Sequence, residues 1–195
     1  SISNNDSGGT GGEDSTTGNS IFGYLAGAAV ASGGLNNVLV GHRAGNELTD
    51  GDNNVVMGNL AMDDTGSEGA SDCVFIGYSA GGGDWAGGTS KDVAIGYQAM
   101  NGAMNGANDS VAIGYQAATA QVSGVEGVYI GRSAGAGLTN QSYNIYIGAY
   151  SGYVLNGGGK NTAMGYSAMK SAGTAANNDA AENVAVGYNA LTAIT

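Results

Sequence analysis

The chain repeats one short phrase ten times, and this repetition constrains its fold more than any other feature. The phrase is clearest as SVAIGYQAA at residues 110–118, and it recurs as DVAIGYQAM at 92–100 and NVAVGYNAL at 183–191. Each copy contains an anchor glycine, and these are Gly23, Gly41, Gly58, Gly77, Gly96, Gly114, Gly131, Gly148, Gly165 and Gly187. Successive anchors are 17 to 22 residues apart. A period this regular predicts a solenoid of about ten coils, one for each copy.

The residues before each anchor glycine predict a β-strand. The residue immediately before the anchor is always large and apolar, and the residue two places further back is mostly β-branched, as in Ile113 and Val111. Apolar residues at this spacing of two are typical of a strand with one buried face. We therefore expect an all-β protein, a parallel β-roll or β-solenoid, with these two columns facing its interior.

The column between these two points to the opposite face of the strand, yet it is apolar as well. A roll of about eighteen residues per coil can cover only one face of such a strand. We therefore expect this middle column to form an oligomer interface with other copies of the chain, either in a homotrimer or in a filament. The expected interface residues are Leu39, Val56, Phe75, Ala94, Ala112, Tyr129, Tyr146, Ala163 and Ala185.

The residues after each anchor predict how a coil returns. Glycine takes positive φ at little cost, so a sharp turn is expected there. An alanine stands three places after nine of the ten anchors, and this small residue predicts a second, closely packed strand. Polar segments rich in Gly, Asn, Asp and Ser separate the phrases and are typical of turns.

Composition limits the partners of the chain. With 16 acidic and 5 basic residues the net charge is -11, which argues against nucleic acid and anionic membrane surfaces as partners. No apolar stretch is long enough to insert into a membrane. Residues 1–18 hold one aliphatic residue, Ile2, and predict a polar N-terminal arm ahead of a repeat domain at 19–195.

The phrase N/S/D-V-A-I-G-Y-x-A resembles the head repeats of trimeric autotransporter adhesins and the fibre repeats of phage tail-fibre proteins. The segment from Asn183 to Leu191 is especially similar to the phage repeats. The resemblance implies a left-handed, trimeric β-roll with a structural or adhesive role, located extracellularly, on a cell surface or on a virion. This sequence departs from the family in its longer coils and in Phe75, Tyr129 and Tyr146, which stand where alanine is usual.

Catalytic and cofactor sites are not expected. The single histidine, His42, occupies a column in which six other coils have tyrosine, which predicts a surface position on the ladder. The single cysteine, Cys73, lies in an apolar run and predicts a buried, inert thiol. One histidine and one cysteine are also too few for a typical zinc site.

Two groups of side chains are candidates for ligand contact. Carboxylate and amide oxygens on turns could bind calcium, although their spacing matches no EF-hand, and the alternative is solvated turns; the residues are Asp50, Asp52, Asn54, Asp63 and Asp64. Tyr78, Tyr97 and Tyr115 fit a structural cross-strand ladder or, alternatively, contact with a glycan.

Three functions follow as hypotheses. The chain is a non-enzymatic segment of a phage tail fibre or bacterial surface adhesin, which gives reach and surface attachment. Alternatively it is the subunit of a self-assembling, head-to-tail extracellular filament. A third hypothesis is a glycan-binding module, and a cell-surface glycan or protein receptor is then its partner.

Overall fold

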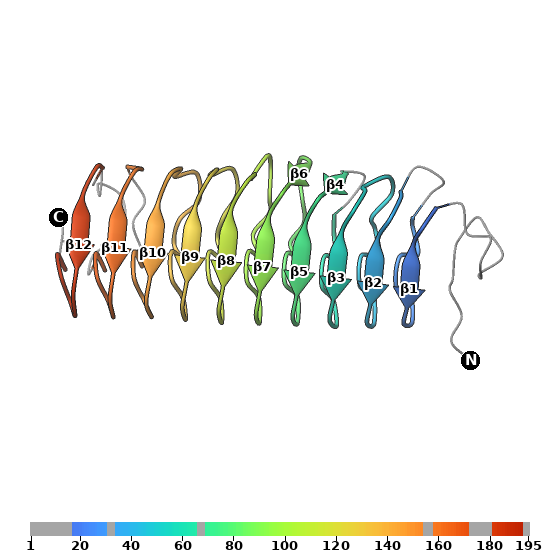
Figure 1. Ribbon diagram of the computed structural model, residues 1–195, viewed down its shortest axis with the longest axis horizontal. Coiled ribbons are helices and arrows are strands. Elements are labelled where there is room, and N and C mark those ends of the chain that lie inside the picture. Colours follow the sequence, from blue (N-terminus) through green and yellow to red (C-terminus); the bar gives the residue numbers. More distant parts are fainter. Residues whose placement is uncertain (1–16, 31–33, 66–68, 154–157, 172–180, 193–195) are drawn as a thin grey trace.

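The computed structural model describes residues 17–30, 34–65, 69–153, 158–171 and 181–192, so most of the expected N-terminal arm lies outside the described residues. The strands are β1 (Ser20–Phe22), β2 (Val38–Val40), β3 (Val55–Met57), β4 (Ala70–Ser71), β5 (Val74–Ile76), β6 (Thr89–Ser90), β7 (Val93–Ile95), β8 (Val111–Ile113), β9 (Val128–Ile130), β10 (Ile145–Ile147), β11 (Thr162–Met164) and β12 (Val184–Val186). None of the described residues belongs to a helix that could cross a membrane. Figure 1 shows an elongated stack with β1 near one end and β12 near the other.

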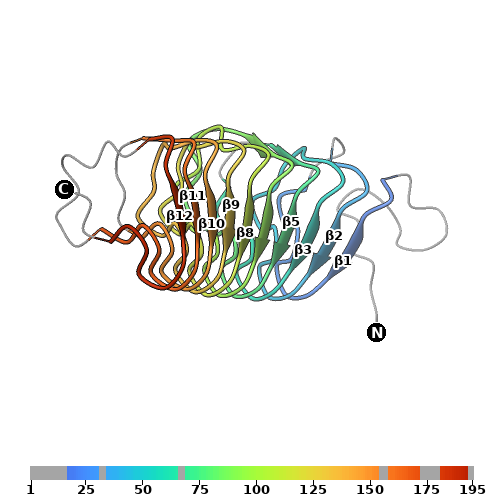
Figure 2. The ribbon, with the colours of Figure 1, turned by 60° about the vertical axis from the view of Figure 1, so that its left-hand side comes forward.

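Ten of the strands form one parallel sheet in the order β1-β2-β3-β5-β7-β8-β9-β10-β11-β12. Each strand pairs with the equivalent residues of the next coil, so that Val111 lies between Val93 and Val128. The strands run along one side of the stack, and the turns close each coil behind them (Figure 2). The β-solenoid predicted from the repeat is confirmed, with one strand of this sheet for each phrase.

The anchor glycine ends each strand at a point where neighbouring coils approach closely. Gly96 has φ of 134°, a conformation that residues with a side chain rarely adopt. A Cβ added at Gly96 would lie 2.4 Å from the carbonyl oxygen of Gly114, and the other anchors from Gly23 to Gly165 meet the next anchor in the same way. The glycine column is therefore required by backbone packing between coils as well as by the turn.

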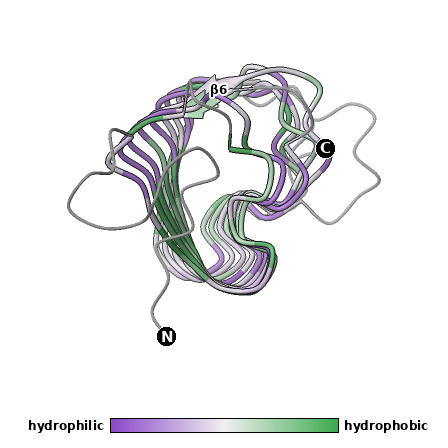
Figure 3. Cartoon of the chain, turned by 90° about the vertical axis from the view of Figure 1, so that its right-hand side faces the viewer, coloured by the Kyte–Doolittle hydropathy of each residue, from purple (hydrophilic) through white to green (hydrophobic). Residues whose placement is uncertain are grey.

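The segment after each anchor is a turn, and the second strand that we expected there does not form. The second and fourth residues after the anchor are left-handed, as in Gln98 (φ 52°) and Met100 (φ 48°). Between them Ala99 is fully buried. The alternating left-handed residues curl the chain back toward the strands (Figure 3), so the small alanine packs inside this curl rather than in a strand. A short parallel pair, β4 with β6, lies elsewhere in the coil.

The middle residue of each strand, and not its two neighbours, faces the interior of the roll. Ala112 is fully buried, whereas Ile113 is 36% exposed. The predicted oligomer interface is therefore wrong, because the whole column belongs to the hydrophobic core of a single chain. The residues concerned are Leu39, Val56, Phe75, Ala94, Ala112, Tyr129, Tyr146, Ala163 and Ala185, all at 0 to 4% exposure.

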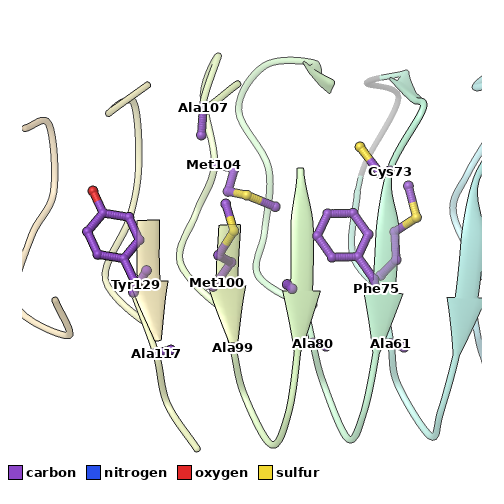
Figure 4. Close-up of a cluster of buried hydrophobic side chains, with 14 of the residues drawn as sticks. Ala61, Cys73, Phe75, Ala80, Ala99, Met100, Met104, Ala107, Ala117 and Tyr129 are labelled. Carbon is purple, nitrogen blue, oxygen red and sulfur yellow. The ribbon is translucent and has the colours of Figure 1, made fainter. Parts of the chain in front are cut away.

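The interior is filled by matching the middle residue to the residue four places after the anchor. That residue is glycine wherever the middle residue is Ile, Leu, Phe or Tyr, and never where it is Ala or Val. The pairs are Ile21 with Gly27, Leu39 with Gly45, Val56 with Met62, Phe75 with Gly81, Ala94 with Met100, Ala112 with Ala118, Tyr129 with Gly135, Tyr146 with Gly152, Ala163 with Met169 and Ala185 with Leu191. A Cβ at Gly81 would lie 2.7 Å from a ring carbon of Phe75. Phe75, Met100 and Tyr129 thus fill equivalent interior positions in different coils (Figure 4).

A column of buried polar side chains lies directly before the strands. Asn37 Oδ1 accepts a hydrogen bond from the backbone N–H of Asn54 at 2.9 Å. Asn54 Oδ1 in turn accepts from the N–H of Cys73 at 3.0 Å, and its Nδ2 donates to the carbonyl of Ala70 at 2.7 Å. Because an unpaired backbone group in the interior costs about 1–3 kcal/mol, these amides are a structural requirement. The sequence predicts them as turn residues, and Asn54 also as a calcium candidate, but not as a buried column.

Candidate functional site: the outer face of the sheet

The two columns that flank the buried middle residue form an apolar surface on the outside of the roll, which we call the outer stripe. Its members are all at least partly exposed, and the exposed fractions include 36% for Ile130, 40% for Met57 and 67% for Val186. The first column is Ser20, Val38, Val55, Val74, Val93, Val111, Val128, Ile145, Thr162 and Val184, and the second is Phe22, Val40, Met57, Ile76, Ile95, Ile113, Ile130, Ile147, Met164 and Val186. In the cross-section of Figure 3 the strands form one straight, largely hydrophobic side.

The outer stripe is large for a surface exposed to water. Ten strands at a spacing of about 4.8 Å give it a length of about 43 Å. The exposed fractions correspond to apolar area on the order of 1,000 Å², whereas the largest patch on a typical monomer is about 300–600 Å². This area is also comparable to what one partner buries in a stable protein interface, about 800 Å².

Charged groups border the outer stripe and none stands within it, and one margin carries ion pairs between coils. Two Lys–acid pairs bridge neighbouring coils there, Lys91 with Asp109 at 4.0 Å and Lys160 with Glu182 at 3.2 Å. Neither column of the stripe contains an acidic or basic residue. A partner seated on the stripe would therefore bury no charge of this chain, so it would incur no desolvation cost for one.

The tyrosines that we singled out lie at the other margin and stack on one another. The ring centroids of Tyr78 and Tyr97 are 5.1 Å apart, as are those of Tyr97 and Tyr115, with interplanar angles of 11° and 6°. The Arg132 guanidinium lies 5.7 Å from the Tyr115 ring centroid and 5.5 Å from that of Tyr150. Both faces of Tyr97 are therefore occupied by neighbouring rings, and a sugar could reach only the edges of this ladder.

The calcium candidates do not converge in the structure. Asp52 Oδ1 accepts a hydrogen bond from the N–H of Leu35 at 2.7 Å, and Asn54 is committed to the buried polar column. Asp63 Oδ1 lies 3.0 Å from Arg43 Nε, without hydrogen-bond geometry. Asp50 and Asp64 are exposed. Within the described ranges, no three His, Cys, Asp or Glu side chains gather as metal ligands.

His42 and Cys73 are placed as the sequence predicted. The imidazole of His42 is exposed and stacks on the ring of Tyr24, with centroids 5.6 Å apart and an interplanar angle of 8°. Cys73 is a buried free thiol. Burial raises the pKa of this thiol to about 12, so it is not a thiolate near neutral pH. A nucleophilic thiol needs an adjacent base. His42 is exposed whereas Cys73 is buried, so these two side chains do not form such a pair.

Two shallow hollows occur near the end that carries β12. One contains Tyr143, Lys160 and Glu182 in its wall, and the other is lined in part by Tyr166 and Lys170. Each lining includes residues that border segments outside the described residues, Gly158 and Ala181 in the first and Ser171 and Thr192 in the second. Neither hollow by itself defines a ligand site.

No protein-family model, curated protein or solved structure matches the chain. The outer stripe is therefore interpreted from its geometry and composition. Sequence reasoning identified the two columns correctly as a row of β-branched and large apolar residues, but assigned them to the wrong face. The signal that assigns the faces is the size matching between the middle residue and the residue four places after the anchor.

Proposed function

We propose that the chain is a non-enzymatic structural segment of a fibre that associates side by side with further copies of itself. The observation that carries this proposal is the outer stripe, a continuous apolar surface on one face of an elongated solenoid. Its extent exceeds what a soluble monomer ordinarily exposes. The interface lies on the flanking columns, as represented by Val111 and Ile113, and not on the buried column of Ala112.

Further copies of this chain are the partners that fit the stripe best. A second copy presents the same two columns at the same strand spacing, so Val and Ile side chains can interdigitate rung by rung along the whole length. The charged margin, with Lys91 and Asp109, then remains solvated at the rim, as in most protein interfaces. Three copies side by side are the expected assembly, in keeping with the resemblance to trimeric adhesin and phage-fibre repeats.

The proposed role is mechanical reach and attachment, in a phage tail fibre or a bacterial surface adhesin. Ten stacked coils give an extended shape from a short chain. The same strand pairing and the same type of core recur from coil to coil. The location that goes with this role is extracellular, on a cell surface or on a virion. A glycan-binding role through Tyr78, Tyr97 and Tyr115 has less support, because these rings stack on one another.

Sedimentation analysis of the purified chain tests the proposal. We expect a discrete species of about three times the chain mass, and a double substitution of Ile95→Lys and Ile113→Lys should convert it to a monomer with an unchanged far-ultraviolet circular dichroism spectrum. Leu35→Lys is the matched control, since Leu35 is 38% exposed, close to the 36% of Ile113, but lies outside the stripe. The control should remain oligomeric.

Three results would contradict the lateral assembly. A wild-type chain that is monomeric at all concentrations would show that the stripe is uncovered in solution. An oligomer that survives both lysines would place the interface elsewhere. A mass that grows without limit with concentration would favour the head-to-tail filament instead.

A further inference from the structure

The buried polar column contains one carboxyl group, Asp92, at a position where six of the other nine coils have asparagine. Asp92 is 0% exposed. It lies directly before β7, as Asn54 lies directly before β3. The side chain of Asn54 makes two kinds of hydrogen bond to the next coil. Its Oδ1 accepts from the backbone N–H of Cys73, and its Nδ2 donates to the carbonyl of Ala70.

Asp92 makes the first kind of hydrogen bond in the same way. Its Oδ1 accepts the backbone N–H of Ser110 at 2.8 Å. The second kind, donated to the carbonyl of Ala107, falls to the hydroxyl of Thr89, which contacts both that carbonyl and Asp92 Oδ2. A hydroxyl has only one proton to donate, so with an ionised Asp92 one of these two contacts joins acceptors with no proton between them.

We propose that Asp92 carries a proton in the folded chain at mildly acidic pH, where an ordinary aspartate is ionised, and that losing this proton weakens the junction between the β7 and β8 coils. With the proton on Oδ2, Asp92 donates to Thr89 Oγ1 and Thr89 donates to the carbonyl of Ala107. All contacts are then satisfied, and the acid takes the place of an asparagine. On ionisation the proton passes to solvent and a buried carboxylate remains.

The surroundings of Asp92 favour the neutral form. Burial raises the pKa of Asp92 to about 7, the hydrogen bonds from Thr89 and Ser110 oppose that rise, and the charge of Asp109 adds to it. Among the described residues packed on Asp92, the neighbouring Cys73 stays neutral because burial raises the pKa of its thiol to about 12. The one cation nearby, Lys91, has a side chain 62% exposed and pairs with Asp109.

The sign of the pH effect follows from the raised pKa. Between pH 3.8, the ordinary value, and about 7, the folded chain holds a proton that the unfolded chain has released. Stability contributed by Asp92 is therefore full below about pH 4, falls as the pH rises to about 7, and is flat above. Since each pH unit between the two values is a tenfold factor, the folding equilibrium constant should fall roughly a thousand-fold over this range.

Urea unfolding of the full chain at pH 4 to 8 tests the proposal by comparing wild type with Asp92→Asn. The amide can accept from Ser110 and donate to Thr89 at every pH, so the variant should match or exceed wild type at pH 8. The ratio of the two folding constants should change by two to three powers of ten. Asp84→Asn, which removes an exposed carboxylate that does not act on Asp92, is the control and should keep the pH dependence of wild type.

A direct measurement on the wild-type chain does not depend on any variant folding. The carboxyl carbon resonance of Asp92, assigned in the wild-type chain by correlation to its own Cβ and backbone nuclei, should titrate with a midpoint near neutral pH. A midpoint in the ordinary aspartate range would overturn the proposal. The proposal would also be overturned if the ratio of the folding constants of wild type and Asp92→Asn did not change with pH. A variant Asp92→Asn that is less stable than wild type at pH 8 would overturn it as well.

Discussion

The size of the middle residue of each strand is matched to the size of the residue four places after the anchor. We therefore predict that the interior residues of one coil can be replaced by those of the next. Phe75 with Gly81 and Ala94 with Met100 fill equivalent space in adjacent coils. Phe75→Ala alone removes a fully buried ring, for which a loss of about 3–5 kcal/mol is expected. Gly81→Met alone places a Cβ 2.7 Å from that ring, and we expect overpacking of about 1–3 kcal/mol in addition to about 1–2 kcal/mol for a left-handed non-glycine residue.

Combined, the two substitutions should recover much of this loss, because the methionine enters the space that the ring leaves. The left-handed cost remains, and Trp85 loses its edge contact with Phe75, so the double variant should still be less stable than wild type. We expect urea unfolding followed by circular dichroism to give a favourable coupling of at least about 2 kcal/mol in a double-mutant cycle. Gly106→Met is the matched partner for a control cycle, since Gly106 is also left-handed but has no atom within 4 Å of an added Cβ. Additivity of Phe75→Ala and Gly81→Met within about 0.5 kcal/mol would refute the matching.

Two further predictions concern the polar and glycine columns, both measured as free energies of unfolding in urea. Asn54→Ala leaves the N–H of Cys73 and the carbonyl of Ala70 without partners, so we expect a loss of about 2–5 kcal/mol, against less than about 0.5 kcal/mol for the exposed Asn59→Ala. Gly96→Ala brings Cβ within 2.4 Å of a backbone oxygen and should cost more than about 3 kcal/mol. A cost near that of a surface substitution, in either case, would mean that the column adapts and is not a structural requirement.

The fold could be predicted from the sequence because a solenoid repeats its signal. One copy of the phrase is too short to distinguish a strand from a buried turn, but ten copies with an anchor glycine define both the strand and the stacking. The parallel register follows directly, since equivalent residues such as Val93 and Val111 lie side by side. The prediction of a second strand was wrong because a small residue indicates close packing but not a particular backbone conformation. Here the left-handed residues on either side of Ala99 place it in a curled turn.

The two faces of the strand could not be assigned from hydropathy. Three consecutive apolar residues, as in Val111 to Ile113, satisfy either face, and the period-two pattern favours the larger β-branched residues as the interior ones. In the folded coil the middle residue and the residue four places after the anchor share the interior beside the strand. The middle residue therefore ranges in size from Ala112 to Tyr129, and its size does not indicate which face it occupies.

The pattern of variation along the chain supports the outer stripe as the surface that meets other copies. The middle column ranges from alanine to tyrosine, and in nine of the ten coils its size is matched by a residue such as Gly152 or Met169; the exception is Ala112 with Ala118. The outer stripe has no such partner within the chain, and it varies little over its central rungs, with valine from Val38 to Val128 and isoleucine from Ile76 to Ile147. A surface that packs against identical copies must keep one shape on every rung, because a change at one rung can be compensated only by the neighbouring chain. Uniformity outside and compensated variation inside are thus what the proposed lateral assembly would require, with the outer stripe packed between chains and the interior packed within each coil.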